Sequence, residues 1–453
     1  GSGMAGLTAG AYLCKNGHNV LIIEKSEKTG GLVTSFERDG FTFDAGIRAF
    51  ENSGIILPML RQLGINIDFI KNPVSLGIEK DFIYLKTTES IKDYHELLLK
   101  NFPSQTKQID RIINEIKKVI GYMDVLYGID NPLFMDLKHD RNYLTKTLLP
   151  WIIKYYKNIR KIEMLNMPIN EYLLNFTQDM HLIDTITQHF FADTPAFFAL
   201  SYFGLYLDYS YTKGGTQTLA SSLTSFILEN SGKILLKTEI SKIDSEGKKL
   251  FSTDSQMFEY DQLIWAADLK KFYGNLEKNS LKRINSNKKS EQTYNAIINA
   301  DTSESVLTLY LAVDQPKELF ENAFGAHCFY TPQKIGLSSI ASFKKSINSV
   351  ENLAGYIYKY LDLTTYEISC PVIRDKSLAP QGKTGLIIST LFDYDLAKLA
   401  EQKDWYEEFK VLCKDKIIDV LDKTILEGLK SKVIFGVISS PLTLEKSTFN
   451  TRG

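Results

Sequence analysis

The stretch that decides the fold is Gly1-Ser2-Gly3-Met4-Ala5-Gly6, which continues as Leu7-Thr8-Ala9-Gly10. In a loop that joins a strand to a helix, the first glycine permits a tight turn and the second lets the backbone approach a pyrophosphate. The third glycine lets the helix pack closely on its sheet. Gly17 then stands where a glycine commonly ends a helix. The stretch therefore predicts a phosphate-binding loop that opens a helix.

A buried strand and an acidic residue follow this helix. The apolar run Val20-Leu21-Ile22-Ile23 is typical of a parallel strand that is covered on both faces. Glu24 ends the run, and about twenty residues beyond such glycines a carboxylate accepts hydrogen bonds from both ribose hydroxyls of a dinucleotide. The same carboxylate would repel a 2′-phosphate. Because loop, helix, strand and acid are in register, the sequence predicts a Rossmann-like dinucleotide-binding site.

Two later glycine blocks extend the pattern. Gly30-Gly31 precedes a stretch that turns at Asp39-Gly40 and ends at Asp44-Ala45-Gly46, and spacing alone makes this a glycine turn with an ordinary β-hairpin. Lys213-Gly214-Gly215-Thr216-Gln217 begins a helix that we expect to run to residue 229. With these blocks, and with 380–384 and 440–442, the sequence resembles the phytoene desaturase, carotenoid isomerase and retinol saturase family of the flavin amine oxidase superfamily.

The resemblance implies FAD as the cofactor and an α/β fold. In this fold a Rossmann-like FAD-binding domain, of the two-dinucleotide-binding-fold type, is interleaved with an α+β substrate domain. The second glycine pair would lie along the ribityl and pyrophosphate groups, 44–46 and 265–268 near the isoalloxazine, and the backbone of Ile240 at the adenine. The glycine loop and the resemblance together assign FAD binding to Gly1, Gly3, Met4, Ala5, Gly6, Glu24, Lys25, Gly30, Gly31, Asp44, Gly46, Ile240, Ala266 and Ala267.

One position departs from the pattern of many amine oxidases. They have Arg directly after the second glycine pair, where this chain has Leu32. Carotenoid isomerases and retinol saturases are similar in lacking that Arg. The resemblance thus implies a FAD-dependent oxidoreductase that desaturates, saturates or isomerises an apolar isoprenoid or polyene. A flavin amine oxidase-like dehydrogenase and a non-catalytic prenyl-lipid-binding protein of the same fold stay open as alternatives.

The order of patterns along the chain predicts an interleaved organisation. We expect residues 1–86 to form the first part of the FAD-binding domain and 87–211 a helical substrate region, with a helix over 104–127. Residues 212–272 would complete the FAD-binding domain, with strands at 233–237, 239–243, 257–260 and 262–267. Residues 273–453 would form a sheet-based substrate domain, with strands at 306–313 and 385–392 and a long helix near 404–429.

Both ends of the sequence lack parts that the family has. The glycine loop normally follows a first β-strand, yet Gly1 is the first residue of the sequence. Family members also end with a glycine-rich segment that contacts FAD, and the sequence stops at 450–453, where that segment would begin. We therefore expect a fragment that lacks the first strand and the C-terminal FAD segment.

Composition restricts the partners and the location. Lys plus Arg (53) and Asp plus Glu (54) nearly cancel, which argues against nucleic-acid binding. The four cysteines and six histidines show no spacing typical of disulfides or metal ligands, so we expect no metal. No signal peptide and no apolar run long enough to span a bilayer is found. We expect a cytoplasmic protein, leave its association with a membrane surface open as an alternative, and leave its oligomeric state open.

Two segments bear on the substrate. The stretch 190–209 is rich in Phe and Tyr, and it either packs as a buried helix or forms the wall of a pocket for an apolar polyene. The segment 148–161 mixes Trp151, Tyr155 and Tyr156 with cations, which is typical either of a helix in a lipid interface or of an ordinary surface helix. The sequence shows no nucleophile or paired-carboxylate motif, so catalytic residues stay unnamed, as is usual where a flavin moves the electrons.

Overall fold

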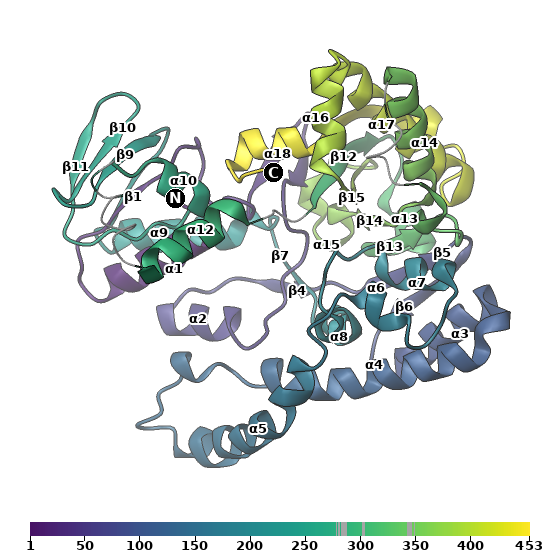
Figure 1. Ribbon diagram of the computed structural model, residues 1–453, viewed down its shortest axis with the longest axis horizontal. Coiled ribbons are helices and arrows are strands. Elements are labelled where there is room, and N and C mark those ends of the chain that lie inside the picture. The colour runs from purple at the N-terminus through teal and green to yellow at the C-terminus, as the bar shows by residue number, and fades with distance from the viewer. Residues whose placement is uncertain (278, 280, 282–287, 301–303, 342–346, 348) are drawn as a thin grey trace.

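The computed structural model describes residues 1–277, 279, 281, 288–300, 304–341, 347 and 349–453 (Figure 1). Around the first residue, α1 (Met4–Lys15) and α9 (Gln217–Glu229) pack on a parallel pair of strands, β1 (Leu21–Ile23) and β8 (Lys233–Leu235). Gly10 makes this packing close, because a Cβ there would lie 2.8 Å from Cδ1 of Ile22. The helices predicted to open at the first and third glycine blocks are thus confirmed.

An antiparallel sheet extends this region away from the rest of the molecule. It consists of β9 (Ile240–Asp244), β10 (Lys249–Ser252) and β11 (Met257–Glu259), with α10 (Leu269–Gly274) and α12 (Lys288–Asn299) beside it (Figure 1). The strand expected over 262–267 is wrong. In the described residues no strand pairs with this segment, and a strand requires a neighbour that takes up its backbone hydrogen bonds.

The centre of the molecule is a sheet of seven strands in the described part of the chain, which we call the large sheet. Its order is β16-β12-β15-β14-β13-β5-β6, and neighbours run antiparallel except β13 and β5. The strands are β5 (Val74–Ile78), β6 (Asp81–Leu85), β12 (Ser305–Val313), β13 (His327–Thr331), β14 (Tyr366–Ser369), β15 (Thr384–Phe392) and β16 (Val433–Ser439). The strands predicted at 306–313 and 385–392 are confirmed as β12 and β15.

The first predicted boundary, at residue 86, needs correction. The strands β5 and β6 lie within 1–86, which we expected to belong wholly to the FAD-binding domain. They pair instead with β13 at one end of the large sheet. The physical reason is that β5 is apolar and largely buried, so it needs a strand on each side, and β13 and β6 supply them.

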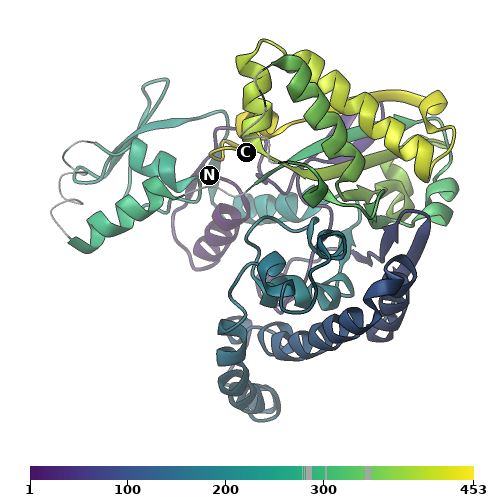
Figure 2. The ribbon, with the colours of Figure 1, turned by 45° about the vertical axis from the view of Figure 1, so that its right-hand side comes forward.

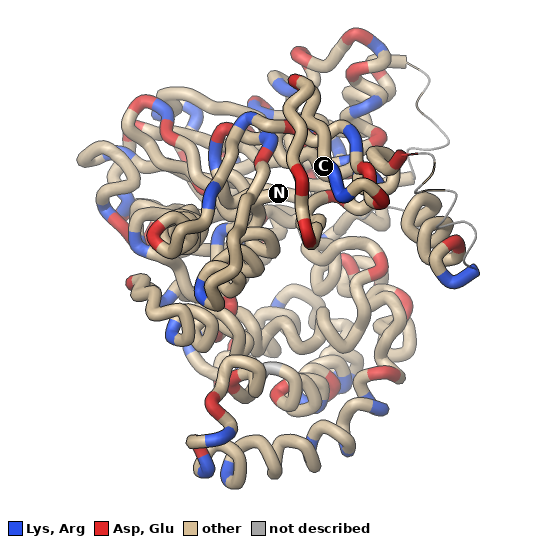
Figure 3. The backbone as a smooth tube through the Cα atoms, turned by 90° about the vertical axis from the view of Figure 1, so that its left-hand side faces the viewer, with Lys and Arg blue, Asp and Glu red and all other residues tan. Residues whose placement is uncertain are grey.

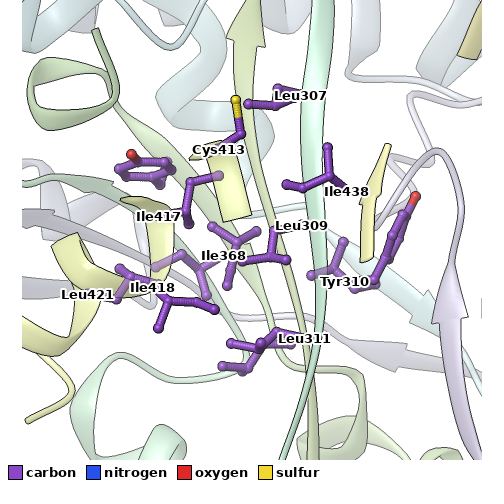
Figure 4. Packing of buried hydrophobic residues seen from close by; sticks show 14 of the residues in the cluster. Leu307, Leu309, Tyr310, Leu311, Ile368, Cys413, Ile417, Ile418, Leu421 and Ile438 are labelled. Carbon is purple, nitrogen blue, oxygen red and sulfur yellow. The ribbon is translucent and has the colours of Figure 1, made fainter. Parts of the chain in front are cut away.

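One face of the large sheet is apolar and carries the main core. Side chains of this face form a row across four strands, at Leu309, Ile388, Ile368 and Cys328, all fully buried. The helices α14 (Val350–Leu363) and α17 (Tyr406–Thr424) cover them (Figures 1 and 4). The long helix predicted near 404–429 is α17. We call this side the apolar face; α13 (Lys317–Ala323), α15 (Pro371–Arg374), α16 (Tyr394–Gln402) and α18 (Pro441–Thr448) lie around it.

The opposite face differs in chemistry and we call it the polar face. The register aligns Thr308, Ser389, Glu367 and Phe329 in one row across β12, β15, β14 and β13. The next row holds Tyr310, Ile387, Ser369 and His327. Near Tyr310 this face is covered by the hairpin of β2 (Ser35–Arg38) and β3 (Phe41–Asp44). Near His327 it is covered by the helical region.

The helical region occupies the lower part of Figure 1. The long helix α4 (Thr106–Tyr127), close to its predicted bounds, packs against α8 (Ala196–Tyr206). α5 (Leu149–Glu163) lies at the lower edge of the molecule in Figures 1 and 2. The remaining elements are α2 (Ile56–Leu63), α3 (Ile91–Asn101), α6 (Ile169–Leu173), α7 (Met180–Thr187), and the paired strands β4 (Phe69–Lys71) and β7 (Ser210–Thr212).

Charged residues, helix lengths and cysteines all fit a globular protein. Basic and acidic residues are interspersed along the backbone (Figure 3). Within the described residues, none of the helices combines the length and the apolar character needed to cross a bilayer. The four cysteines are buried as free thiols.

Candidate cofactor site and the cavity beside it

The two glycine loops touch each other at the start of α1. Gly3 and Gly30 form an isolated parallel bridge, and the Gly30 N–H donates to the Ser2 carbonyl at 2.8 Å. Gly31 is left-handed, with φ of 59°, and a Cβ there would lie 3.2 Å from Cα of Gly3. A side chain at this position would force the loops apart, so their contact depends on glycine.

The N-terminus of α1 is uncapped and open. Gly3 is the N-cap residue, and among the described residues no side chain caps this helix end. A Cβ at Gly3 would meet nothing within 4 Å, so the loop borders free space. First-turn amides and the helix dipole attract anions, and phosphate is a typical ligand of such a terminus.

Glu24 lies at the end of β1 and is already hydrogen-bonded. Its Oε2 accepts from the backbone N–H of Ser2 at 2.6 Å and from the Ser2 hydroxyl at 2.8 Å, and Oε1 accepts from the Ser26 N–H at 2.8 Å. Burial alone would raise the pKa of Glu24, but these hydrogen bonds outweigh burial and lower it. A carboxylate offers about four acceptor positions. Glu24 is therefore ionised, with room for one further donor rather than the two that the sequence suggested.

These elements surround one cavity of about 850 Å³, which we call the glycine-loop cavity. Lys25 on its wall pairs with Glu239 at 2.6 Å and lies 3.9 Å from the centre of the Phe449 ring. Phe36 and Ala45 also line it. The predicted cofactor residues that line this cavity are Gly1, Gly3, Met4, Ala5, Glu24, Lys25, Gly30, Gly31, Ile240, Ala266 and Ala267.

The other predicted cofactor residues, Gly6, Asp44 and Gly46, lie behind the cavity wall. A Cβ at Gly6 would lie 2.0 Å from the Gly1 carbonyl oxygen, and one at Gly46 would lie 2.1 Å from that of Leu32, so both glycines serve backbone packing. The buried Asp44 accepts hydrogen bonds from Ser35, Tyr211 and Thr216 at 2.6 to 2.9 Å. These bonds tie the β2–β3 hairpin to the third glycine block.

The residues of this cavity fit a dinucleotide. Its volume lies in the usual range of about 300–1,000 Å³ for ligand sites. It combines an uncapped helix N-terminus for a pyrophosphate with an ionised carboxylate on the first strand for a ribose. Among the described residues, no group of three or more His, Cys, Asp or Glu is placed to hold a metal ion.

A short segment leads from this cavity to the polar face of the large sheet. Ala45 lines the glycine-loop cavity, and its carbonyl accepts from the hydroxyl of Tyr310 at 3.0 Å. Three residues later Arg48 is buried on the polar face, where Nη1 donates to the Gly46 carbonyl at 2.9 Å and Nη2 donates to Thr308 and Ser389. The segment 45–51 thus connects the two regions.

Arg48 and His327 hold Glu367 on the polar face. Glu367 Oε2 lies 3.4 Å from Arg48 Nη1, and Oε1 lies 3.0 Å from His327 Nε2. Burial would raise the pKa of Glu367, but Arg48 first, then His327 and Arg374, lower it to about 2. The side chain nevertheless remains 28% exposed in a strand that has a neighbour on each side. Glu367 is therefore an ionised carboxylate that is partly exposed although strands flank it on both sides.

A second, smaller cavity lies among the aromatic side chains of the helical region, and we call it the aromatic cavity. The Phe329 ring, beside Glu367 in the row, contacts Tyr206 and His189, with ring centres 5.1 and 5.4 Å apart. The cavity encloses about 40 Å³. It is lined by Leu76, Tyr94, Ile116, Ile169, Ile186, His189, Phe190, Ala199, Leu200, Tyr202, Phe203 and Tyr206. The stretch 190–209 thus contributes both a buried helix and a cavity wall.

Glu51 is a second carboxylate beside these tyrosines. Burial and the nearby Asp208 raise its pKa to about 7, although a hydrogen bond with Tyr202 lowers it. Tyr202 in turn bonds the hydroxyl of Tyr209 at 2.7 Å. The imidazole of His189 bonds Tyr206 at 3.0 Å, and burial lowers its pKa to about 4. At neutral pH this side of the fold therefore holds a neutral histidine, a half-ionised Glu51 and an ionised Glu367.

The sequence did not reveal this polar group. Arg48 and Glu367 are 319 residues apart, so no local spacing links them. The available signal was a charged residue within an apolar stretch. Arg48 and Glu51 come shortly after Gly46, and Glu367 lies within the strand Tyr366–Ser369. Such residues are rarely buried without a partner.

Comparison with known proteins identifies the family. The family described as "Flavin containing amine oxidoreductase" matches residues 4–351. This match covers most of the chain, and the chain belongs to that family.

Curated relatives and solved structures extend this result. A chloroplastic prolycopene isomerase of Daucus carota is 25% identical over 465 residues, which cover 98% of this chain and 68% of the relative. A 4,4'-diapophytoene desaturase of Staphylococcus aureus is 21% identical over 479 residues, 99% of this chain and 85% of the relative. An all-trans-retinol 13,14-reductase of Danio rerio is 23% identical over 260 residues, 54% of this chain and 41% of the relative.

Among solved structures, a putrescine oxidase variant from a redesign of cofactor binding has a TM-score of 0.59 at 13% identity, over 100% of this chain and 85% of that chain. An oxidoreductase from Methanosarcina mazei has a TM-score of 0.59 at 14% identity, over 97% and 86%. These likenesses support the predicted α/β fold over nearly the whole chain.

Proposed function

We propose that this member of the flavin-containing amine oxidoreductase family binds FAD in the glycine-loop cavity and acts on an apolar isoprenoid or polyene. The observation that carries the proposal is the segment 45–51. It lines the glycine-loop cavity at Ala45 and reaches the polar face of the large sheet at Arg48. At Glu51 it bonds Tyr202, which lines the aromatic cavity. The segment 45–51 would thus bring a bound redox cofactor close to an apolar substrate.

The chain's own residues would hold FAD in a defined order. The N-terminus of α1 and the two glycine loops would take the pyrophosphate, and the open acceptor position of Glu24 would take a ribose hydroxyl. The backbone around Ile240 would meet the adenine, and Ala45 with Ala266 and Ala267 would border the isoalloxazine. A bound flavin supplies the electron-transfer chemistry, and the protein supplies position and electrostatics.

The substrate side suits an apolar molecule. The lining of the aromatic cavity is dominated by aromatic and aliphatic side chains, which bind extended apolar groups through dispersion and stacking. Its present volume of about 40 Å³ is too small for a polyene, so Tyr202, Tyr206 and Phe190 would have to rotate aside when the substrate enters. Such a cavity keeps water away from the reacting bond.

We also propose that α5 approaches a membrane surface from which such a substrate would come. Leu149, Ile153, Tyr156 and Met164 recur at helical spacing and are 50%, 59%, 73% and 75% exposed. Trp151 anchors the opposite side through a hydrogen bond from its indole to the carbonyl of Val125. The cations Lys154, Lys157, Arg160 and Lys161 belong to the same helix. An apolar stripe flanked by cations suits anionic lipid.

The test of the FAD proposal is the absorbance of the purified protein. We expect flavin bands and FAD on release by heat, with Gly3→Val losing the flavin because a bulky side chain would fill the space that the pyrophosphate needs. Gly121→Ala is the matched control, since a Cβ there also meets nothing within 4 Å but lies in α4, far from the cavity. A protein without flavin, or a Gly3→Val variant that retains it, would remove the proposal.

The substrate part is tested by anaerobic incubation with three polyenes taken from the names of the relatives: prolycopene, all-trans-retinol and 4,4'-diapophytoene. Chromatography separates isomerisation, saturation and desaturation products, and flavin absorbance reports reduction. We expect one of the three to be converted. Conversion of putrescine and none of the polyenes would favour the amine dehydrogenase alternative instead.

A further inference from the structure

A short backbone pairing fixes Glu51 beside the tyrosines of the helical region. Phe50 and Ser210 form an antiparallel bridge, in which each backbone N–H donates to the other residue's carbonyl at 2.8 Å. Glu51 is therefore opposite Tyr209, and opposite residues of an antiparallel pair project their side chains to the same side. Glu51 is thus held against the end of the aromatic stretch 190–209.

Hydrogen bonds connect Glu51 to two of these tyrosines. The Glu51 carboxyl is hydrogen-bonded to the hydroxyl of Tyr202, which lies 2.7 Å from the hydroxyl of Tyr209. On the solvent side, Asp208 is exposed and Glu51 is half-buried, whereas only 7% of Tyr209 is exposed. These groups form a chain that runs from the surface at Asp208 into the fold at Tyr202 and Tyr209.

Tyr202 belongs to the wall of the aromatic cavity. Its ring meets the rings of Phe190 and Tyr206 edge to face, with centres 5.3 and 4.8 Å apart, and all three residues line the cavity. A ligand that occupies the enlarged cavity would contact Tyr202. A single hydrogen bond therefore separates the wall of the cavity from Glu51, a carboxyl that solvent reaches.

Desaturation and saturation of a hydrocarbon chain move a proton as well as a hydride. In desaturation two C–H bonds break: one hydrogen leaves as a hydride to the bound flavin, and the other leaves as a proton. The electron pair of the second bond forms the new C=C bond. Saturation reverses both transfers, and an isomerisation that adds and then removes a proton uses the same group twice. A group of the protein must therefore exchange a proton with the ligand.

We infer that the hydroxyl of Tyr202 exchanges this proton with the ligand in the aromatic cavity, and that Glu51 exchanges it with solvent. In saturation, the proton of Tyr202 forms the new C–H bond while the proton of Glu51 passes to Tyr202. In desaturation both transfers run the other way. Water beside Asp208 then restores the starting state of Glu51. This inference rests on the proposed function for the flavin and for the use of the aromatic cavity.

The groups that face Glu51 allow it to change its protonation state. Burial and the nearby Asp208 raise its pKa, the hydrogen bond with Tyr202 lowers it, and the result is about 7. Burial raises the pKa of Tyr202, and it raises that of Tyr206 and Tyr209 well above the usual value. The three hydroxyls therefore stay neutral. Tyr202 can give up its proton only while it takes one from Glu51.

The other titratable groups on this side of the fold do not offer an exchangeable proton at neutral pH. Glu367 stays ionised, because Arg48 and His327 lower its pKa to about 2 against the effect of burial. His189, which bonds Tyr206 at 3.0 Å, stays neutral, because burial lowers its pKa to about 4. Glu51 is thus the group of this side that both gains and loses a proton near neutrality.

The first test follows the proton of Glu51 without ligand or turnover. Infrared difference spectra of the purified protein should show a protonated carboxyl band that disappears as the pH rises through about 7. The band should be absent in Glu51→Gln and shifted in Tyr202→Phe, which keeps the ring and loses the hydroxyl. Tyr172→Phe is the matched control, since it removes a hydroxyl that donates to Glu115 at 2.9 Å elsewhere in the helical region. A band that Tyr202→Phe leaves unchanged would overturn the inference.

The second test uses the flavin-containing protein and whichever of prolycopene, all-trans-retinol and 4,4'-diapophytoene it converts. Tyr202→Phe should lower kcat by about 10²–10⁴-fold, the usual contribution of a general acid or base, and should change KM little. Glu51→Gln should also lower kcat and remove its pH dependence near neutrality. Tyr172→Phe should leave kcat and KM unchanged. A Tyr202→Phe variant with the kcat of the wild-type protein would contradict the inference.

The sense of the pH dependence distinguishes the directions of the reaction. Saturation requires a protonated Glu51, so kcat should fall as the pH rises through about 7. Desaturation requires an ionised Glu51, so kcat should rise over the same range.

Conversion and flavin content separate this inference from the proposed function. A protein that contains flavin and converts a polyene equally well without the Tyr202 hydroxyl refutes the inference alone. A protein without flavin, or one that converts none of the three polyenes, refutes the proposed function, and the inference falls with it.

Discussion

The two faces of the large sheet use the same strands for different purposes. On the apolar face, Leu309, Ile388 and Ile368 pack under α14 and α17 without a polar atom between them. One residue away on each strand, the polar face presents Thr308, Ser389 and Glu367. Because side chains alternate along a strand, stability and ligand contact can be encoded independently in one sheet.

The difference between the two faces predicts which property a mutation on each face should change. A residue of the apolar face contributes mainly to the free energy of unfolding, since its contacts are all within the core. A residue of the polar face contributes mainly to charge and hydrogen bonding, and its removal should alter pH dependence or ligand binding. Four predictions test this division, from the largest expected effect to the smallest.

The largest effect is expected on the apolar face. Leu309→Ala removes a fully buried side chain beside Ile368 and Ile388, and such truncations cost about 2–5 kcal/mol of unfolding free energy. The control is Leu228→Ala on α9, where the side chain is 53% exposed and the expected change is below about 0.5 kcal/mol. Denaturant unfolding measures both. If Leu309→Ala lowered the free energy of unfolding as little as Leu228→Ala, the proposed difference between the two faces would be wrong.

The second prediction concerns the pH dependence of stability through Glu51. Its pKa is raised from an ordinary 4.5 to about 7 by burial and Asp208, so the folded protein holds the proton more tightly than the unfolded chain. The stabilisation is fully present below pH 4.5 and is lost as the pH rises to about 7, by about 3 kcal/mol in total.

Glu51→Gln keeps the neutral form and should flatten the stability profile between pH 4.5 and 7. Glu367 titrates in the opposite sense: its pKa is lowered to about 2, so its stabilisation is present above its unfolded pKa and is lost only as the pH falls toward 2. Unfolding curves at a series of pH values separate the two carboxylates. An unchanged slope in Glu51→Gln would show that Glu51 is not the group that titrates near neutrality.

The third prediction moves from the sheet to the glycine-loop cavity. Glu24→Ala should weaken FAD binding by about 1–2 kcal/mol, since one charge-assisted hydrogen bond to a ribose hydroxyl is lost. The Ser2 N–H would also lose its acceptor, so part of the effect would fall on loop stability. Titration of flavin into the apoprotein measures the change, and Glu27→Ala on the same wall is the control. Equal affinities of the two variants would argue against the ribose contact.

The sequence predicted the parts of the fold that depend on local pattern. The loop, α1 and β1 follow from glycine spacing and an apolar run, and α4 follows from its helical repeat of isoleucines. The assignment of residues 74–85 to the FAD-binding domain was wrong because the partner strand, β13, lies about 250 residues further along the chain. The strand predicted over 262–267 was wrong because an apolar run alone does not supply a partner strand.

The candidate site was predictable to the same extent. Eleven of the residues assigned to FAD from the glycine loop and the family resemblance line the glycine-loop cavity, and this placement rests on backbone loops that the motifs encode. Asp44 was expected near the isoalloxazine, but its side chain bonds Ser35, Tyr211 and Thr216 inside the fold. The group around Glu367 is formed by Arg48 and by residues from β12, β13, β14 and β15, and it could only be found after the register of the sheet was known.

The smallest effect is expected for Thr308→Val on the polar face, which keeps the shape of the side chain and replaces its hydroxyl by a methyl group. The Thr308 hydroxyl lies 2.8 Å from that of Ser389 and accepts from Arg48 Nη2 at 3.3 Å. Its loss should cost about 0.5–1.5 kcal/mol of unfolding free energy, because Ser389 still accepts from the same guanidinium nitrogen and a buried methyl group replaces the hydroxyl. The looser guanidinium should nevertheless hold Glu367 less firmly, so the loss of stability as the pH falls toward 2 should begin at a higher pH than in the wild-type protein. Thr390→Val lies on the same strand as Ser389 but faces the other side and bonds Thr364, so it should lower stability by a similar amount and leave the acid dependence unchanged. The same shift of the acid dependence in both variants would mean that it reports the stability of the sheet rather than the chemistry of its polar face.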